Sequence, residues 1–110
     1  MSVIVTISFP GDPERLEAAA AENEQMLQDI RERAVAAGLI AHRFYGSENQ
    51  LLVIDEWPDA DSFQHFFGSI QEDIAPLMEQ IGASEEPSVS FWRKLDSRDE
   101  YGWGAEQPGG

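Results

Sequence analysis

Two histidines, His42 and His65, are the side chains of this sequence best suited to acid–base chemistry. An imidazole titrates near neutral pH, so it can take a proton from a bound molecule and return it. His42 alternates with Ile40 and Phe44 in a predicted strand, and the three side chains therefore share one strand face. It is either a partly buried histidine with a structural hydrogen bond or a catalytic base. His65 lies beside the apolar stripe of a predicted helix, where a surface position is the simpler interpretation.

Two neighbouring carboxylates, Asp55 and Glu56, lie near the end of another predicted strand. Consecutive strand residues project to opposite faces, so one of these carboxylates is expected to point inward. An inward carboxylate can orient a histidine, or it can pair with Arg43 or Arg93. A structural ion pair is the simpler role, because a buried carboxylate needs a partner.

An aromatic pocket is the kind of site that the large side chains favour. Small-molecule sites are mostly apolar and contain few polar groups. Most of the aromatic residues must fill the core, but a subset can line such a pocket. The side chains expected to line it are Tyr45, Asp55, Trp57, Phe66 and Met78.

Neither a metal ion nor a bound cofactor is expected. The sequence has no cysteine, which excludes disulfides, thiolate nucleophiles and cysteine-based zinc sites. The two histidines lack the i, i+4 spacing of a metal-binding helix, and no carboxylate cluster accompanies them. Phosphate-binding loops and dinucleotide fingerprints are also missing from the sequence.

The charge of the chain restricts its partners. It has 110 residues, of which 21 are acidic and 7 basic, and its formal net charge is -14. Phosphate backbones and anionic membrane surfaces repel such a protein, so we expect neither a nucleic acid nor a membrane as partner. The N-terminal segment has no basic region, and its apolar residues stop at Pro10, unlike a signal peptide or a membrane span. A cytoplasmic location is therefore expected.

Four strands must position the candidate site residues. The first is rich in β-branched residues, and the last follows Pro87. The second and third are separated by a short turn and form an antiparallel hairpin. The predicted strands span residues 3–9, 39–45, 50–57 and 88–95.

Two helical regions connect these strands. Asp12 and Pro13 begin one long helix that ends at Gly38. The second region divides before Ser69, which forms a capping-box pattern with Glu72. The apolar stripe of the first helix consists of Leu16, Ala20, Asn23, Leu27, Ile30 and Ala34.

The resulting β-α-β-β-α-β order predicts an α+β domain over residues 1–95, with the ferredoxin-like fold and a four-stranded antiparallel sheet. A polar tail, residues 96–110, follows this domain. The tail is expected to be flexible or docked on a partner subunit. Docking is an option because Tyr101 and Trp103 are costly to leave in water.

The predicted sheet is apolar on both faces, although two helical regions can cover only one of them. Residues 3–5 and 51–54 show no polar alternation, and Phe91 and Trp92 place large rings on opposite faces. The second face must also be buried, and a second copy of the chain is the simplest partner. A homodimer in the form of a dimeric α+β barrel is expected. A monomer whose own tail covers the open face is the alternative.

The segment over residues 52–63, LVIDEWPDADSF, resembles the antibiotic biosynthesis monooxygenase family. In that family the third strand ends in a Glu-Trp or acid-x-Trp pattern and runs into a helix with an Ala/Ser–Phe/Leu pair. Phe66-Phe67 and the stretch IAPLM over residues 74–78 are similar to a subgroup of small bacterial members. The resemblance covers residues 3–95. It implies a dimeric α+β barrel in which each subunit holds a pocket between sheet and helices.

Two activities occur among such relatives. Some oxidise phenolic or quinol-type substrates with oxygen and no cofactor, and others bind and degrade haem. Haem-degrading relatives use an Asn, a Trp and a His at places that here hold Ile4, Phe66 and Pro76, so haem degradation is not expected. Many oxygenase relatives have a histidine near Phe66, and His65 stands one position earlier in this chain.

The resemblance therefore implies a cofactor-independent, monooxygenase-like protein that acts on or binds a small aromatic molecule of the phenol or quinol type. His42 and His65 are its candidate catalytic residues. The alternative is a non-catalytic homodimer that binds a small molecule or serves as an interaction module.

Overall fold

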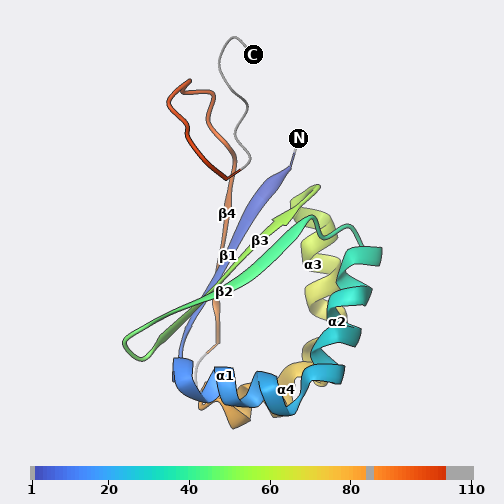
Figure 1. Ribbon diagram of the computed structural model, residues 1–110. Helices are drawn as coiled ribbons and strands as arrows, with labels where there is room; N and C mark the ends of the chain where they lie inside the picture. Colours follow the sequence, from blue (N-terminus) through green and yellow to red (C-terminus); the bar gives the residue numbers. More distant parts are fainter. Residues whose placement is uncertain (1, 84–85, 104–110) are drawn as a thin grey trace.

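The computed structural model describes residues 2–83 and 86–103 and shows a single sheet with all helices on one side (Figure 1). These described residues form four strands and four helices. In chain order they are β1 (Val3–Pro10), α1 (Pro13–Glu22), α2 (Glu24–Ala36), β2 (Ala41–Ser47), β3 (Gln50–Trp57), α3 (Ala60–Ser69), α4 (Gln71–Gln80) and β4 (Ser88–Trp92).

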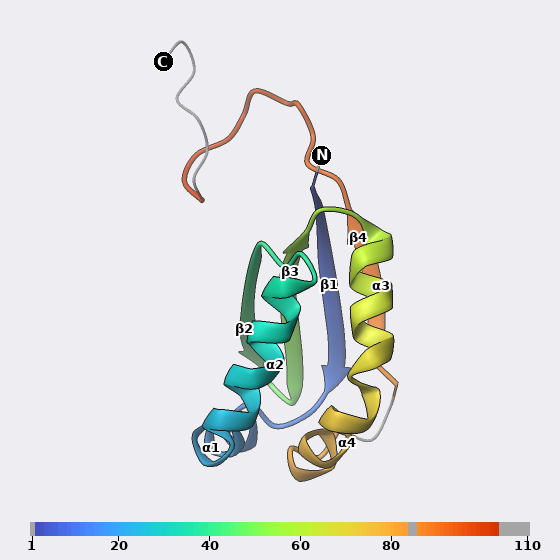
Figure 2. The same ribbon diagram turned by 90° about the vertical axis from the view of Figure 1, so that its right-hand side faces the viewer.

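The sheet has the strand order β2-β3-β1-β4, and all neighbouring strands are antiparallel. Viewed from the helix side, α2 lies in front of β2 and β3, while α3 lies in front of β4, beside β1 (Figure 2). This is the α+β, ferredoxin-like architecture predicted from the order of elements. That prediction is confirmed.

Burial alternates along the two central strands. Val5, Ile7 and Phe9 of β1 are buried, and so are the four alternate residues of β3 from Leu51 to Trp57. Their neighbours point to the opposite face, which no helix covers (Figure 1). The two faces of the sheet therefore have different surroundings: helices cover one side, and no helix or strand within residues 2–83 and 86–103 covers the other.

The first helical region is two helices, so the prediction of one long helix is wrong. Asp12 caps α1 as expected, because its carboxylate accepts a 2.9 Å hydrogen bond from the backbone N–H of Glu14. The chain then breaks at Asn23, whose amide donates to the carbonyl of Ala19 at 2.7 Å. Asparagine competes with the helix through such local bonds. As a result α2 takes a different direction from α1 (Figure 1).

The second helical region divides at Ile70, close to the predicted division. The predicted capping box is wrong, because no side chain caps α4 and the hydroxyl of Ser69 donates to the carbonyl of Phe66 at 2.6 Å. The side-chain cap in this region lies earlier. Asp59 accepts a 2.7 Å hydrogen bond from the backbone N–H of Ser62 at the start of α3.

The last strand is shorter than predicted and ends at Trp92. The following segment leads away from the domain (Figure 1). Leu95, Tyr101 and Trp103 are exposed in it. Docking of this tail on a partner stays a prediction, and its last residues, 104–110, lie outside the described part of the chain. Within residues 2–83 and 86–103, no helix is long and apolar enough to cross a membrane.

Candidate functional site

A cavity of about 740 Å³ lies between the inner face of the sheet and the helices. This volume falls in the range of about 300–1,000 Å³ that small-molecule sites occupy. Its lining is mostly apolar and comes from the sheet and from all four helices. Side chains that form its walls include Ile7, Phe9, Val53, Trp57, Phe63 and Phe66.

One pair of polar side chains is built into this wall. His42 of β2 and Asp55 of β3 are directly opposite each other in the antiparallel register, and both line the cavity. Nδ1 of His42 and Oδ1 of Asp55 are 2.6 Å apart. Asp55 is 7% exposed, whereas the His42 side chain is 32% exposed. The carboxylate is thus buried behind the imidazole, which remains accessible.

A third group completes the arrangement. Nε1 of Trp57 donates a hydrogen bond of 3.1 Å to Oδ2 of Asp55. Trp57 is two residues from Asp55 on the same strand face and is 1% exposed. Each oxygen of the buried carboxylate therefore has a partner, which is the condition for burying such a group.

These contacts decide which nitrogen of His42 is basic. An ionised carboxylate only accepts hydrogen bonds, so Nδ1 of a neutral His42 must carry the proton and donate it to Asp55. Nε2 then keeps its lone pair and can accept a proton from a molecule in the cavity. The ring is also held by Phe44, which meets it edge-on with ring centroids 5.0 Å apart. The geometry suits a general base oriented by a carboxylate.

Aromatic rings form the wall next to the pair. Trp57 contacts Phe66 and Phe63, with centroid separations of 5.5 Å and 5.9 Å. Phe63 also stacks on Phe67 at 5.1 Å. A flat aromatic ligand would find ring faces and edges here with which to pack.

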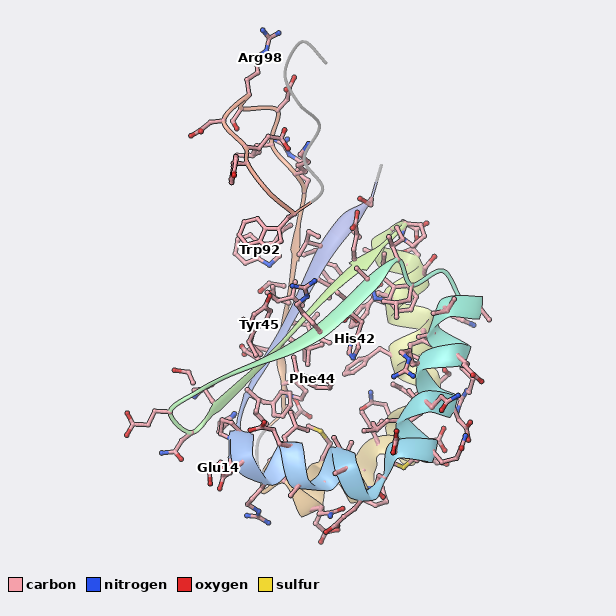
Figure 3. The ribbon with its side chains drawn as sticks, in the orientation of Figure 1. Glu14, His42, Phe44, Tyr45, Trp92 and Arg98 are labelled. Carbon is pink, nitrogen blue, oxygen red and sulfur yellow. The ribbon has the colours of Figure 1, made fainter. Side chains whose placement is uncertain are left out.

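The candidate residues from the sequence fall into two groups. His42 and four of the expected pocket residues line the cavity together: Asp55, Trp57, Phe66 and Met78. Tyr45 and His65 are not among its lining residues. Figure 3 shows Tyr45 on the side of the sheet away from the helices, opposite to His42 and Phe44. His65 is exposed on α3.

Sequence reasoning missed several polar residues of the cavity lining, among them Arg31 of α2. It comes four residues after Leu27 and three before Ala34, and this spacing places it on the inner side of the helix. That spacing was the available signal. No group of three or more metal-binding side chains occurs in the described ranges, 2–83 and 86–103.

Comparison with models of known protein families gives no match, and neither does comparison with curated protein sequences. Solved structures do match. A dimeric ferredoxin-like protein from an uncultured marine organism has a TM-score of 0.63 at 14% identity, over 87% of this chain and 90% of the other. A monooxygenase of Streptomyces coelicolor in complex with the ligand nanaomycin D has a TM-score of 0.60 at 19% identity, over 97% of this chain and 92% of the other.

A cofactor-independent oxygenase of Streptomyces nogalater, solved as a mutant, also matches, with a TM-score of 0.55 at 16% identity over 90% of this chain and 98% of the other. The matches cover nearly the whole length of each relative. At such low identities they show a shared fold. The chain therefore has the α+β fold found in these oxygenases and in the dimeric ferredoxin-like protein, in agreement with the family that its sequence resembles.

Proposed function

We propose that this chain is a cofactor-independent oxygenase that acts on a small aromatic molecule of the phenol or quinol type. The observation that carries the proposal is the hydrogen-bonded chain from Trp57 through Asp55 to His42, which ends on a basic nitrogen in an apolar cavity. The names of two structural neighbours, a monooxygenase and a cofactor-independent oxygenase, support the same reaction class.

The first step is deprotonation of the substrate. Nε2 of His42 takes the acidic proton, and the carboxylate of Asp55 stabilises the imidazolium that forms. The electron-rich substrate anion then adds oxygen at a carbon that carries a hydrogen, and the peroxide that forms takes the proton back from Nε2 of His42. Loss of water from the resulting hydroperoxide leaves a carbonyl group, so one oxygen atom enters the product and the other leaves as water. The substrate supplies all the electrons, and no cofactor is required.

The proposed enzyme is a homodimer joined through the open sheet face. Side chains on this face include Ile4, Leu52, Ile54, Tyr45 and Trp92. Apolar patches of this kind mark interfaces. The dimeric state of one structural neighbour supports a second copy of this chain as the partner.

Oxygen uptake with a panel of hydroquinones and naphthohydroquinones tests the proposed reaction. The wild-type chain is expected to consume oxygen, and His42→Ala is expected to lower the rate by about 100- to 10,000-fold, which is the usual contribution of a general base. His65→Ala is the matched control, since it removes the histidine that lies outside the cavity. Equal rates in His42→Ala and wild type, with folding checked by circular dichroism, would refute the role of His42.

A non-catalytic ligand-binding homodimer is the second candidate. The volume and apolar lining of the cavity favour this candidate as much as the enzyme, because a small molecule can bind in such a cavity without reacting. Saturable binding of the same hydroquinones without oxygen uptake would favour this candidate over the enzyme.

A further inference from the structure

Arg31 is the unusual residue of the cavity. Leu27 and Ala34 of the same helix also line it, so Arg31 occupies a place in an otherwise apolar stripe on α2. The residue is exposed as well as lining the cavity, which places it where the cavity opens to solvent. A charged side chain at such a place is available to a molecule that enters.

The other polar side chains around the cavity that could bind an anion have partners. His42 is bonded to Asp55. The guanidinium of Arg43 donates to the hydroxyl of Tyr45 at 3.3 Å, on the open side of the sheet. The amide of Gln71 donates to the carbonyl of Phe67 at 2.8 Å. Arg31, by contrast, makes no hydrogen bond or ion pair with any residue in the described ranges.

Two neighbouring arginines on this side of the molecule do have hydrogen-bond acceptors. Arg33, two residues further along α2, pairs with Asp73 at 2.9 Å. Arg15 donates to the carbonyl of Gln80 at 2.6 Å. Arg31 faces the cavity without an acidic partner among the described residues, although the chain has 21 acidic residues, so its guanidinium is available to a bound ligand.

We infer that Arg31 binds an anionic substituent of the ligand, so that the ligand is an aromatic acid with a carboxylate or a similar group. This inference rests on the proposed function for the aromatic part of the ligand, and Arg31 adds the anionic group. Glu79 and Glu86 also line the cavity, from α4 and from the segment before β4, and both repel an anion. The carboxylate is accordingly expected at α2, with the rings packed toward Trp57.

Binding of a matched pair of ligands tests this inference without any turnover. 2-Naphthoate carries a carboxylate at neutral pH, and 2-naphthamide has nearly the same shape but no charge. Isothermal titration of the full chain is expected to show naphthoate binding about tenfold more tightly, the effect of one charge-assisted hydrogen bond in a partly exposed site. Raising the salt concentration should reduce this preference.

Arg31→Gln is expected to abolish the preference while leaving the affinity for naphthamide unchanged. Arg33→Gln, on the same helix but outside the cavity, is the matched control and should keep it. The inference is overturned if wild type does not bind naphthoate more tightly than naphthamide, or if Arg31→Gln retains the preference. Neither naphthalene reacts with oxygen under these conditions, so a failure of the oxygen-uptake assay and a failure of this test are separate results.

Discussion

At the scale of single residues, the indole of Trp57 determines how a side chain at position 55 can bond to His42. Nε1 of an indole can donate but cannot accept a hydrogen bond. If Asp55 is replaced by Asn, the amide oxygen must therefore face Trp57, and the amide nitrogen must face Nδ1 of His42. The amide then donates to Nδ1, and the proton of the neutral imidazole moves to Nε2, which no longer has a lone pair for the substrate.

In Asp55→Asn the rate of oxygen uptake is therefore expected to fall by about 1,000-fold or more while the fold remains intact. A loss of this size is typical when a catalytic histidine is held in the wrong tautomer. Nitrogen-15 NMR of the His42 ring should show the protonated nitrogen change from Nδ1 to Nε2. Glu56→Gln is the control, because this carboxylate lies on the other face and accepts from the hydroxyl of Ser2. An unchanged tautomer in Asp55→Asn would contradict the orienting role.

The sequence was sufficient to find His42 and Asp55 but not to pair them. Strand alternation gives the face of each residue, while the pairing depends on the register between two strands. That register is set by the turn at residues 48–49, where Asn49 has a φ of 56° and Ser47 pairs with Gln50. The predicted strand ends, residues 45 and 50, leave four residues for the turn and would place His42 opposite Val53 instead of Asp55. A two-residue turn places His42 opposite Asp55 at once.

At the scale of elements, the helices differ from prediction where side chains bond to their own backbone. The apolar stripe continues past Asn23, so periodicity alone gives no sign of a break. The break comes from the Asn23 amide, which also lies 3.3 Å from Oε1 of Gln80 beside α4. A tertiary contact of this kind cannot be seen in local sequence. Of the strands, β1 and β3 were predicted to within one residue, whereas β2 begins and ends two residues later than predicted and β4 ends three residues earlier.

The cap of α3 gives a pH-dependent prediction. Hydrogen bonds from the backbone and hydroxyl of Ser62 lower the pKa of Asp59 below its usual value. A lowered pKa in the folded state means that the cap stabilises at neutral pH and that this contribution is lost as the pH falls through the lowered pKa. Asp59→Ala should therefore be less stable than wild type at neutral pH, and the difference should shrink as the pH falls through the lowered pKa of Asp59.

Urea denaturation at several pH values measures this difference in the free energy of unfolding. Asp59→Asn is a useful companion, since it retains an acceptor for the N–H of Ser62 but cannot titrate. At neutral pH its stability should lie between those of wild type and Asp59→Ala, and its difference from Asp59→Ala should not depend on this titration. A deficit of Asp59→Ala that is independent of pH would mean that the charge of Asp59 does not contribute to the cap.

At the scale of the whole molecule, the uncovered sheet face gives the last prediction. A chain of 12.3 kDa should sediment at about twice this mass at micromolar concentration if the proposed dimer forms. Ile54→Glu places a charge at the centre of the open face and should shift the chain to the monomer, because an unpaired charge in an interface is strongly unfavourable.

Val35→Glu is the control for this experiment. It introduces the same side chain on α2 at a residue that is already 58% exposed, away from the sheet. The control should remain a dimer. If wild type itself sediments as a monomer, the interface proposed for the open face is wrong, and the exposed Trp92 and its 2.8 Å hydrogen bond to Thr6 need another explanation.

Consecutive side chains of β3 point alternately to the cavity and to the open sheet face, and this alternation restricts how the strand can change in evolution. Asp55 and Trp57 belong to the cavity, while Ile54 and Glu56 between them belong to the open face. A deletion or insertion of one residue within this strand would exchange the two sets, moving Asp55 and Trp57 to the open face and so taking the orienting carboxylate and its indole partner away from the base. Relatives of this protein should therefore keep a constant length through the strand itself.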